Sequence, residues 1–154
     1  MRNLLLLVLA SCAAFSIPVR QTYQAVDEVP VGDKGGWVAL DTGETFDVSQ
    51  ILANEGKRPA QLLVHKVEGT FVLVGEGFRN LYTINPSGDS AGVNFVPLSG
   101  APNGVEQPKL RPGVASKCTM LTYKAAQGER KLFIGADGKT SPTDCPDKKE
   151  SSGS

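Results

Sequence analysis

The stretch of sequence that decides the fold is QLLVHKVEGTFVLVGEGFRNLYTINP, residues 61–86. Within it, two apolar segments, residues 62–67 and 71–74, flank the dipeptide Glu68-Gly69. A two-residue loop that ends in Gly between two such segments is typical of a β-hairpin. The sequence therefore predicts two antiparallel strands joined by a tight turn.

The register of this hairpin follows from the length of its loop. Val67 is expected to face Thr70, and His65 is expected to face Val72. Apolar residues then fall on both faces, which predicts a strand covered on both sides rather than one with a face in water. A third strand is expected over residues 81–84, so the stretch as a whole predicts a three-stranded meander.

Length and composition bound the rest of the chain. The protein has 154 residues, which indicates one domain, and its 17 Gly and 10 Pro indicate many turns. Basic and acidic residues number 16 each. This balance argues against a nucleic-acid partner, which calls for a basic patch, and gives no electrostatic reason to bind an anionic membrane.

Residues 1–16 have the pattern of a secretory signal peptide. Arg2 gives a basic start, residues 4–10 form an uninterrupted apolar run, and small residues begin at Ser11. The run is too short to span a bilayer, so we expect this segment to be removed on export. The pattern predicts a secreted, extracellular protein that begins near Ile17.

An alternative interpretation of the same segment is lipidation. The residues Leu9-Ala10-Ser11-Cys12 resemble a bacterial lipobox, in which the Cys is acylated and becomes the new N-terminus. That resemblance implies a periplasmic or outer-membrane lipoprotein that acts as a structural subunit of the cell envelope. The membrane would then be reached only through the lipid anchor. A retained N-terminus is the third alternative.

Either route of export leaves the pair Cys118 and Cys145. Exported domains fold in an oxidising compartment, so an even pair of cysteines predicts a disulfide bond. In the chain-entropy treatment, closing a loop of this length is worth about 3–4 kcal/mol. Two free thiols are the alternative.

After the signal peptide of residues 1–16, the chain divides into three further parts by composition. We expect an extended N-terminal arm over residues 17–34, with an edge strand within residues 21–29, and a β-rich domain over residues 35–146. Residues 147–154 are charged and then rich in Ser and Gly, which predicts a disordered tail.

One helix is predicted over residues 47–56. Asp47 and Gln50 have the spacing of a capping box, and Gly56 is placed for a C-terminal cap. Two helical turns are marginal alone, so the apolar stripe of this helix must dock on a sheet. The stripe consists of Val48, Ile51 and Leu52, and Glu55 continues the same spacing.

The remaining strands are expected over residues 91–98, 118–124 and 131–134, the last turned at residues 136–138. Trp37 is the one Trp of the chain, and we expect it to anchor the core.

Residues 99–113 are predicted to form an irregular loop, because three Pro and three Gly exclude a helix there. A loop of that length is unusual in a compact domain, so it is either functional or a flexible connector.

Two local resemblances bear on the fold class. Residues 37–44 and 132–139 each place mostly apolar residues before a turn with Gly, which resembles the hairpins of β-trefoil proteins. The residues Gly35-Gly36-Trp37 are similar to the Gly-x-Trp that opens the first strand of lipocalins, which implies a barrel. Neither resemblance identifies a family. The sequence predicts an all-β fold with one short helix, as a single antiparallel β-sandwich or a small barrel, with a β-trefoil-like arrangement as one form.

The sharpest chemical motif is Gly88-Asp89-Ser90-Ala91-Gly92, which fits the Gly-x-Ser-x-Gly of α/β-hydrolases. A nucleophilic Ser needs a His base, and the one His of the chain, His65, precedes the motif where α/β-hydrolases place it after. We therefore interpret the motif as a turn and His65 as a polar group at the edge of the core. The protein is expected not to be an enzyme.

Metal and cofactor chemistry is also not expected. Asp137, Asp144 and Asp147 are the best candidates for a weak calcium site, but their spacing matches no EF-hand loop. The glycines of residues 75–77 lack the other elements of a phosphate-binding loop.

These observations predict an exported, non-enzymatic β-domain that binds a protein or glycan partner through its loops. One alternative is a secreted protease inhibitor that presents Lys109 or Arg111, and another is a barrel that encloses a small apolar ligand. The expected partner contacts are Phe78 and Arg79 at a turn, and Lys109, Leu110 and Arg111 in the proline-rich loop.

Overall fold

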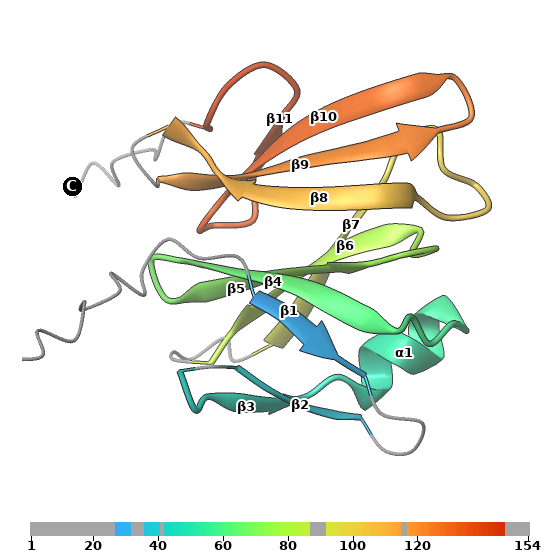
Figure 1. Ribbon diagram of the computed structural model, residues 1–154. Coiled ribbons are helices and arrows are strands. Elements are labelled where there is room, and N and C mark those ends of the chain that lie inside the picture. The colour runs from blue at the N-terminus through green and yellow to red at the C-terminus, as the bar shows by residue number, and fades with distance from the viewer. Residues whose placement is uncertain (1–26, 32–35, 41, 87–91, 115–116, 147–154) are drawn as a thin grey trace, which may run out of the picture.

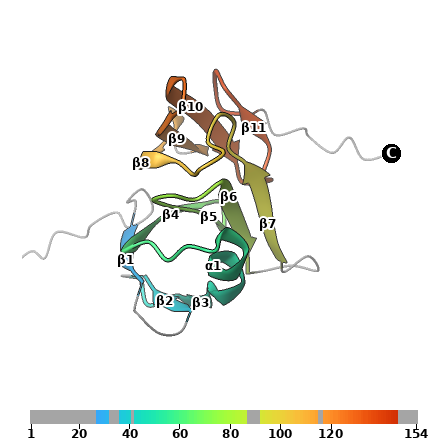
Figure 2. The same ribbon diagram turned by 90° about the vertical axis from the view of Figure 1, so that its right-hand side faces the viewer.

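The fold is a stack of three layers. In the computed structural model, the described residues are 27–31, 36–40, 42–86, 92–114 and 117–146. A four-stranded sheet forms one outer layer and a five-stranded sheet forms the middle layer (Figure 1). A two-stranded hairpin and a short helix form the other outer layer, as the perpendicular view in Figure 2 also shows.

The middle sheet is antiparallel and has the strand order β1-β4-β5-β6-β7. Its strands are β1 (Asp27–Pro30), β4 (Gln61–Val67), β5 (Thr70–Gly75), β6 (Asn80–Asn85) and β7 (Gly92–Pro97). The predicted meander is β4-β5-β6, and the edge strand expected within residues 21–29 is β1, so both predictions are confirmed.

The β4-β5 hairpin has the predicted register. Val67 pairs with Thr70, and His65 pairs with Val72. The two turn residues, Glu68 and Gly69, have φ values of 45° and 86°. A positive φ at both central positions is what a type I′ turn requires, and this turn matches the twist of the strands it joins.

Strand β5 is buried along its whole length. Its large apolar side chains, at residues 71–74, are each at most 1% exposed. Leu73 pairs with Tyr82, whose hydroxyl contacts the helix, whereas Val72 pairs with His65, whose ring contacts the four-stranded sheet. The strand is therefore covered on both faces, as its apolar pattern predicted.

The four-stranded outer sheet is also antiparallel and has the order β11-β10-β9-β8. Its strands are β8 (Glu106–Pro112), β9 (Cys118–Ala125), β10 (Gly128–Gly135) and β11 (Thr140–Ser141). The strands expected over residues 118–124 and 131–134 are confirmed as parts of β9 and β10.

Strand β8 corrects the prediction of an irregular loop over residues 99–113. Pro108 and Pro112 are tolerated because β8 is an edge strand, where a missing N–H group need not break a ladder. The register shifts between Glu106 and Lys109, and Gln107 in this bulge has a φ of 49°. The irregular part is therefore limited to the residues before Glu106.

The remaining layer contains β2 (Trp37–Ala39), β3 (Thr45–Asp47) and α1 (Ser49–Glu55). Trp37 is 71% exposed, so the prediction that it anchors the core is wrong. Alternation in this short strand turns Val38 inward and Trp37 outward.

Helix α1 docks on the middle sheet through the predicted stripe, since Val48, Ile51 and Leu52 are buried. Gly56 ends the helix with a φ of 63°, as predicted. The predicted capping box does not form: the N-cap residue is Val48, and Asp47 instead accepts a hydrogen bond from the Ser49 N–H at 2.8 Å.

The described strands form no closed barrel, because each of the two larger sheets ends in two open edges. The fold is all-β with one short helix, and the antiparallel sandwich is the form it takes. The small-barrel form, which the lipocalin resemblance implied, is not adopted by the described residues.

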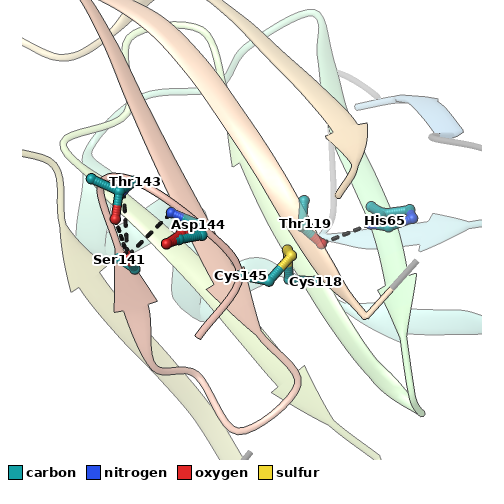
Figure 3. Close-up of a disulfide and its surroundings, with 7 residues drawn as sticks. All are labelled: His65, Cys118, Thr119, Ser141, Thr143, Asp144 and Cys145. Carbon is teal, nitrogen blue, oxygen red and sulfur yellow. Dashed lines mark hydrogen bonds between the residues drawn. A yellow bond between two sulfur atoms is a disulfide. The ribbon is translucent and has the colours of Figure 1, made fainter. Parts of the chain in front are cut away.

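The predicted disulfide is formed between Cys118 and Cys145 (Figure 3). Cys118 begins β9 in the outer sheet, and Cys145 follows β11. The bond therefore holds the segment after β11 to the start of β9.

Removing this disulfide should destabilise the protein. Replacing both cysteines, Cys118→Ser with Cys145→Ser, is expected to lower the free energy of unfolding by about 3 kcal/mol, because the unfolded chain regains the entropy of an open loop. Urea unfolding followed by circular dichroism measures this change. Reductant should produce the same shift in the parent and none in the double variant, and a parent indifferent to reductant would contradict the role given to the bond.

Candidate functional site

The first feature of the candidate site is a buried carboxylate at the end of α1. Glu55 is 5% exposed, and it accepts hydrogen bonds from the backbone N–H groups of Arg79 at 2.7 Å and Asn80 at 3.1 Å. These residues lead the chain from β5 into β6, where buried backbone donors need partners. The carboxylate therefore ties the helix to the middle sheet.

Side chains complete the surroundings of this carboxylate. The Asn80 amide and the Tyr82 hydroxyl donate to Glu55 at 2.8 and 2.7 Å, and the Asn54 amide donates to the Tyr82 oxygen at 2.6 Å. The Arg79 Nε lies 3.8 Å from the carboxylate. A buried charge costs stability unless it is paired and hydrogen-bonded, and Glu55 is both.

Two opposed effects act on the pKa of Glu55. Burial is the largest influence and by itself would raise this pKa, but the hydrogen bonds from Arg79, Tyr82 and Asn80 together lower the pKa below its usual value of 4.5. Glu55 is therefore ionised at neutral pH. Such a carboxylate is poorly suited to general acid–base catalysis, which favours a pKa near the working pH.

Neutralising this carboxylate should weaken the fold. Glu55→Gln is expected to lower the free energy of unfolding by about 1–3 kcal/mol, because an amide leaves some of these donors without an acceptor. The stability that the charge contributes is present above about pH 4.5 and is lost as the pH falls through the lower folded pKa. Urea unfolding across this range measures both effects.

The matched control is Glu129→Gln, at an exposed glutamate of β10. It should change the free energy of unfolding by less than about 0.5 kcal/mol at neutral pH. Equal effects of the two substitutions would contradict the role of Glu55.

An open concavity of about 480 Å³ lies beside this network. One wall is polar and comes from α1 and the start of β6, and the opposite wall is formed by β7 and the segment after it. Arg79 contributes a half-exposed side chain whose guanidinium donates to the Asn54 carbonyl at 3.2 Å. The lining residues are Asn54, Arg79, Asn80, Phe95, Pro97, Leu98, Gly100, Ala101 and Pro102.

Strand β7 brings the exposed ring of Phe95 to this concavity, and Val93 is a second exposed apolar residue of the same strand that does not line it. Phe95 is 59% exposed and Val93 is 39% exposed. The Phe95 ring lies 6.5 Å from the ring of Tyr82, so it sits at the margin of the Glu55 network. A large aromatic side chain left in water on a sheet edge is a candidate contact for another molecule.

The open edges of the two larger sheets differ in how well they are protected. Strand β1 reads DEVP and β8 reads EQPKLRP, so both carry charges and proline, and β8 also has a bulge. Strand β11 has only two residues. Strand β7 reads GVNFVP and has no charged residue. Charges, proline, bulges and short length normally block the addition of a foreign strand, and β7 has such protection only at its final proline.

The predicted partner contacts divide between surface and core. Phe78 and Leu110 are buried, so neither side chain is available to a partner. Phe78 packs edge-to-face on Tyr82, and Leu110 pairs with Leu121 of β9. Arg79 lines the concavity.

Lys109 and Arg111 are exposed, but they belong to the hydrogen-bonded strand β8 and not to a projecting loop. Neither residue lines the concavity.

His65 lies deeper in the core than its predicted place at the edge. It is 1% exposed, and its Nδ1 shares a hydrogen bond of 2.7 Å with the Thr119 hydroxyl (Figure 3). Its Nε2 has no hydrogen-bond partner among the described residues. Burial lowers the pKa of His65 below 6.5, so the buried ring is neutral at physiological pH.

This histidine should make the fold sensitive to mild acid. The pKa of His65 is lower in the folded chain than in the unfolded chain. As the pH falls below about 6.5, His65 therefore becomes protonated in the unfolded chain before it does in the folded chain, and the free energy of unfolding decreases. Urea midpoints at pH 7 and pH 5 should differ in the parent. They should differ much less in the double variant His65→Leu with Thr119→Val, which removes both hydrogen-bonding groups, and an unchanged difference would contradict this assignment.

Several sequence motifs fall outside the described residues. Residues 1–16 with Cys12, the motif around Ser90, and Asp147 are among them. Within the described ranges, no group of three His, Cys, Asp or Glu side chains could hold a metal ion. Asp137 instead pairs with Lys139 at 2.6 Å. None of the described helices is both long and apolar enough to cross a membrane.

The sequence signalled only part of this site. Glu55 followed the spacing of the apolar stripe, which was a sign that it turns inward, but its partners come from another part of the chain. Comparison with protein-family models, curated proteins and solved structures gave no match to this chain.

Proposed function

We propose that this protein is an exported, disulfide-bonded β-sandwich that acts by binding a protein partner and not by catalysis. The observation that carries the proposal is strand β7, an uncharged sheet edge with exposed Phe95 and Val93. A partner would add an extended segment to this edge and place a side chain in the adjoining concavity.

The chemistry of a sheet edge favours a protein over a glycan. An edge strand offers a row of backbone N–H and C=O groups at a spacing that another extended backbone matches. Side chains next to the edge then give specificity, and here they are the exposed Phe95 and the half-exposed Arg79. A glycan that uses only the concavity is the alternative.

Export is supported by the disulfide bond and by the signal-peptide pattern of residues 1–16. A lipid anchor at Cys12 would place the same module at a membrane surface. Neither form changes the binding edge that we propose.

Photo-crosslinking tests this function directly. Phe95 is replaced by benzoyl-phenylalanine, and the exporting cells are irradiated and analysed by mass spectrometry. We expect a discrete protein adduct from position 95, because the reactive ring would lie within the strand-addition interface.

The matched control places the same group at Val114, which is 78% exposed but lies outside β7. It should give only background adducts. Equal adducts at both positions, adducts of glycan alone, or no adduct at position 95 would overturn the proposal.

A further inference from the structure

Among the described strands, β7 has a neighbour only on its β6 side, and its outward backbone groups lie at two defined residues. The Leu98 N–H donates to the Arg79 carbonyl at 2.9 Å, and Phe95 faces Tyr82 in the same register. Residues of an antiparallel strand alternate between hydrogen-bonded and non-hydrogen-bonded positions. Counting back from Leu98, residues 96, 94 and 92 bond to β6, whereas Val93 and Phe95 turn their N–H and C=O groups to the open edge.

Pro97 limits what can pair with this edge. By the same alternation Pro97 also faces outward, but proline has no N–H to donate. An incoming strand therefore finds complete pairs of donor and acceptor at Val93 and Phe95, and only an acceptor at Pro97.

A second copy of β7 satisfies these groups in one particular register. Two identical antiparallel strands related by a twofold axis can centre on Asn94, so that Val93 of each copy faces Phe95 of the other. Every outward N–H and C=O group of Val93 and Phe95 is then matched. Centring on Phe95 would instead place Val93 opposite Pro97, which leaves the Val93 carbonyl without a donor.

Side chains and charge favour the same arrangement. Val93 and Phe95 lie on one face of β7, both are exposed, and the Asn94-centred register sets them side by side as β-branched and aromatic cross-strand pairs. Strand β7 carries no charge, so self-pairing opposes no like charges. The edge strand β8 contains charged residues and proline, which disfavour strand addition.

We infer that the partner of β7 is a second copy of this chain, bound as an antiparallel dimer with Asn94 on the twofold axis. This inference rests on the proposed function, since it names the strand that β7 receives. The contact is limited to a strand of six residues, which places it among the smaller and weaker interfaces. Self-association should therefore depend on protein concentration.

Cysteine substitution tests the register. Asn94→Cys would place two cysteines at a non-hydrogen-bonded pair, where the Cα atoms lie about 4.5 Å apart and a disulfide is sterically allowed. We expect this variant to form a disulfide-linked dimer on a non-reducing gel without added reductant.

Two controls accompany this variant. Val114→Cys is also at an exposed position but lies off β7, and it should run mostly as a monomer on the non-reducing gel, as should the parent, which lacks the added thiol. Phe95→Cys reports the competing register, in which its thiols would meet. A dimer from Phe95→Cys with none from Asn94→Cys would overturn the Asn94-centred pairing, and equal crosslinking at Val114 would show chance collision and overturn it as well.

Sedimentation tests the dimer in the unmodified protein. The apparent mass of the parent should rise toward twice the monomer mass with concentration, and Phe95→Lys should stay monomeric because it places a charge opposite the apolar Val93 of the other copy. Val114→Lys should behave as the parent does.

Failure of the dimer is distinguishable from failure of the proposed function. A parent that stays monomeric, while the photoreactive group at position 95 still captures a different protein, overturns self-pairing and leaves strand addition standing. A monomeric parent with no adduct at position 95 overturns both.

Discussion

The structure depends on the burial of β5 from both faces. Burial of apolar surface is the main favourable contribution to folding, and the four large apolar side chains of β5 point alternately to opposite sides of the middle sheet. One sheet alone would leave one of these faces in water. The chain therefore needs a layer on each side, and it supplies the four-stranded sheet on one side and α1 with its hairpin on the other (Figure 2).

The Glu55 network shows how the helical layer is fixed in place. Apolar packing of α1 has little directional preference, whereas the hydrogen bonds to Glu55 define where the helix ends relative to β6. The same contacts hold Arg79 and Asn54 at the surface, next to Phe95 on β7. The hydrogen bonds to the buried Glu55 thereby position the polar wall of the surface concavity.

Among the described strands, the sandwich architecture leaves four open edges on its two larger sheets, and an open edge is a template for unwanted strand addition. Proline, charge, a bulge and short length appear at β1, β8 and β11. Strand β7 is the exception, with two exposed apolar side chains and no partner strand on its outer side among the described residues. One unprotected edge in an otherwise protected fold is best explained by a binding role for that edge, as proposed for β7.

The sequence by itself determined the elements whose signals are local. The hairpin at Glu68-Gly69, its register, the end of α1 at Gly56 and most of the strands followed from turn residues and apolar spacing, and the cysteine count indicated the disulfide. Tertiary structure decided which side chains meet. The exposure of an aromatic side chain depends on whether another layer packs against it. Phe78 is covered in this way, and Trp37 is not. Residues 106–112 form a strand, despite their prolines, because they lie at the edge of the outer sheet and, within the part of the chain that the structure describes, pair on one side only, with the following strand β9.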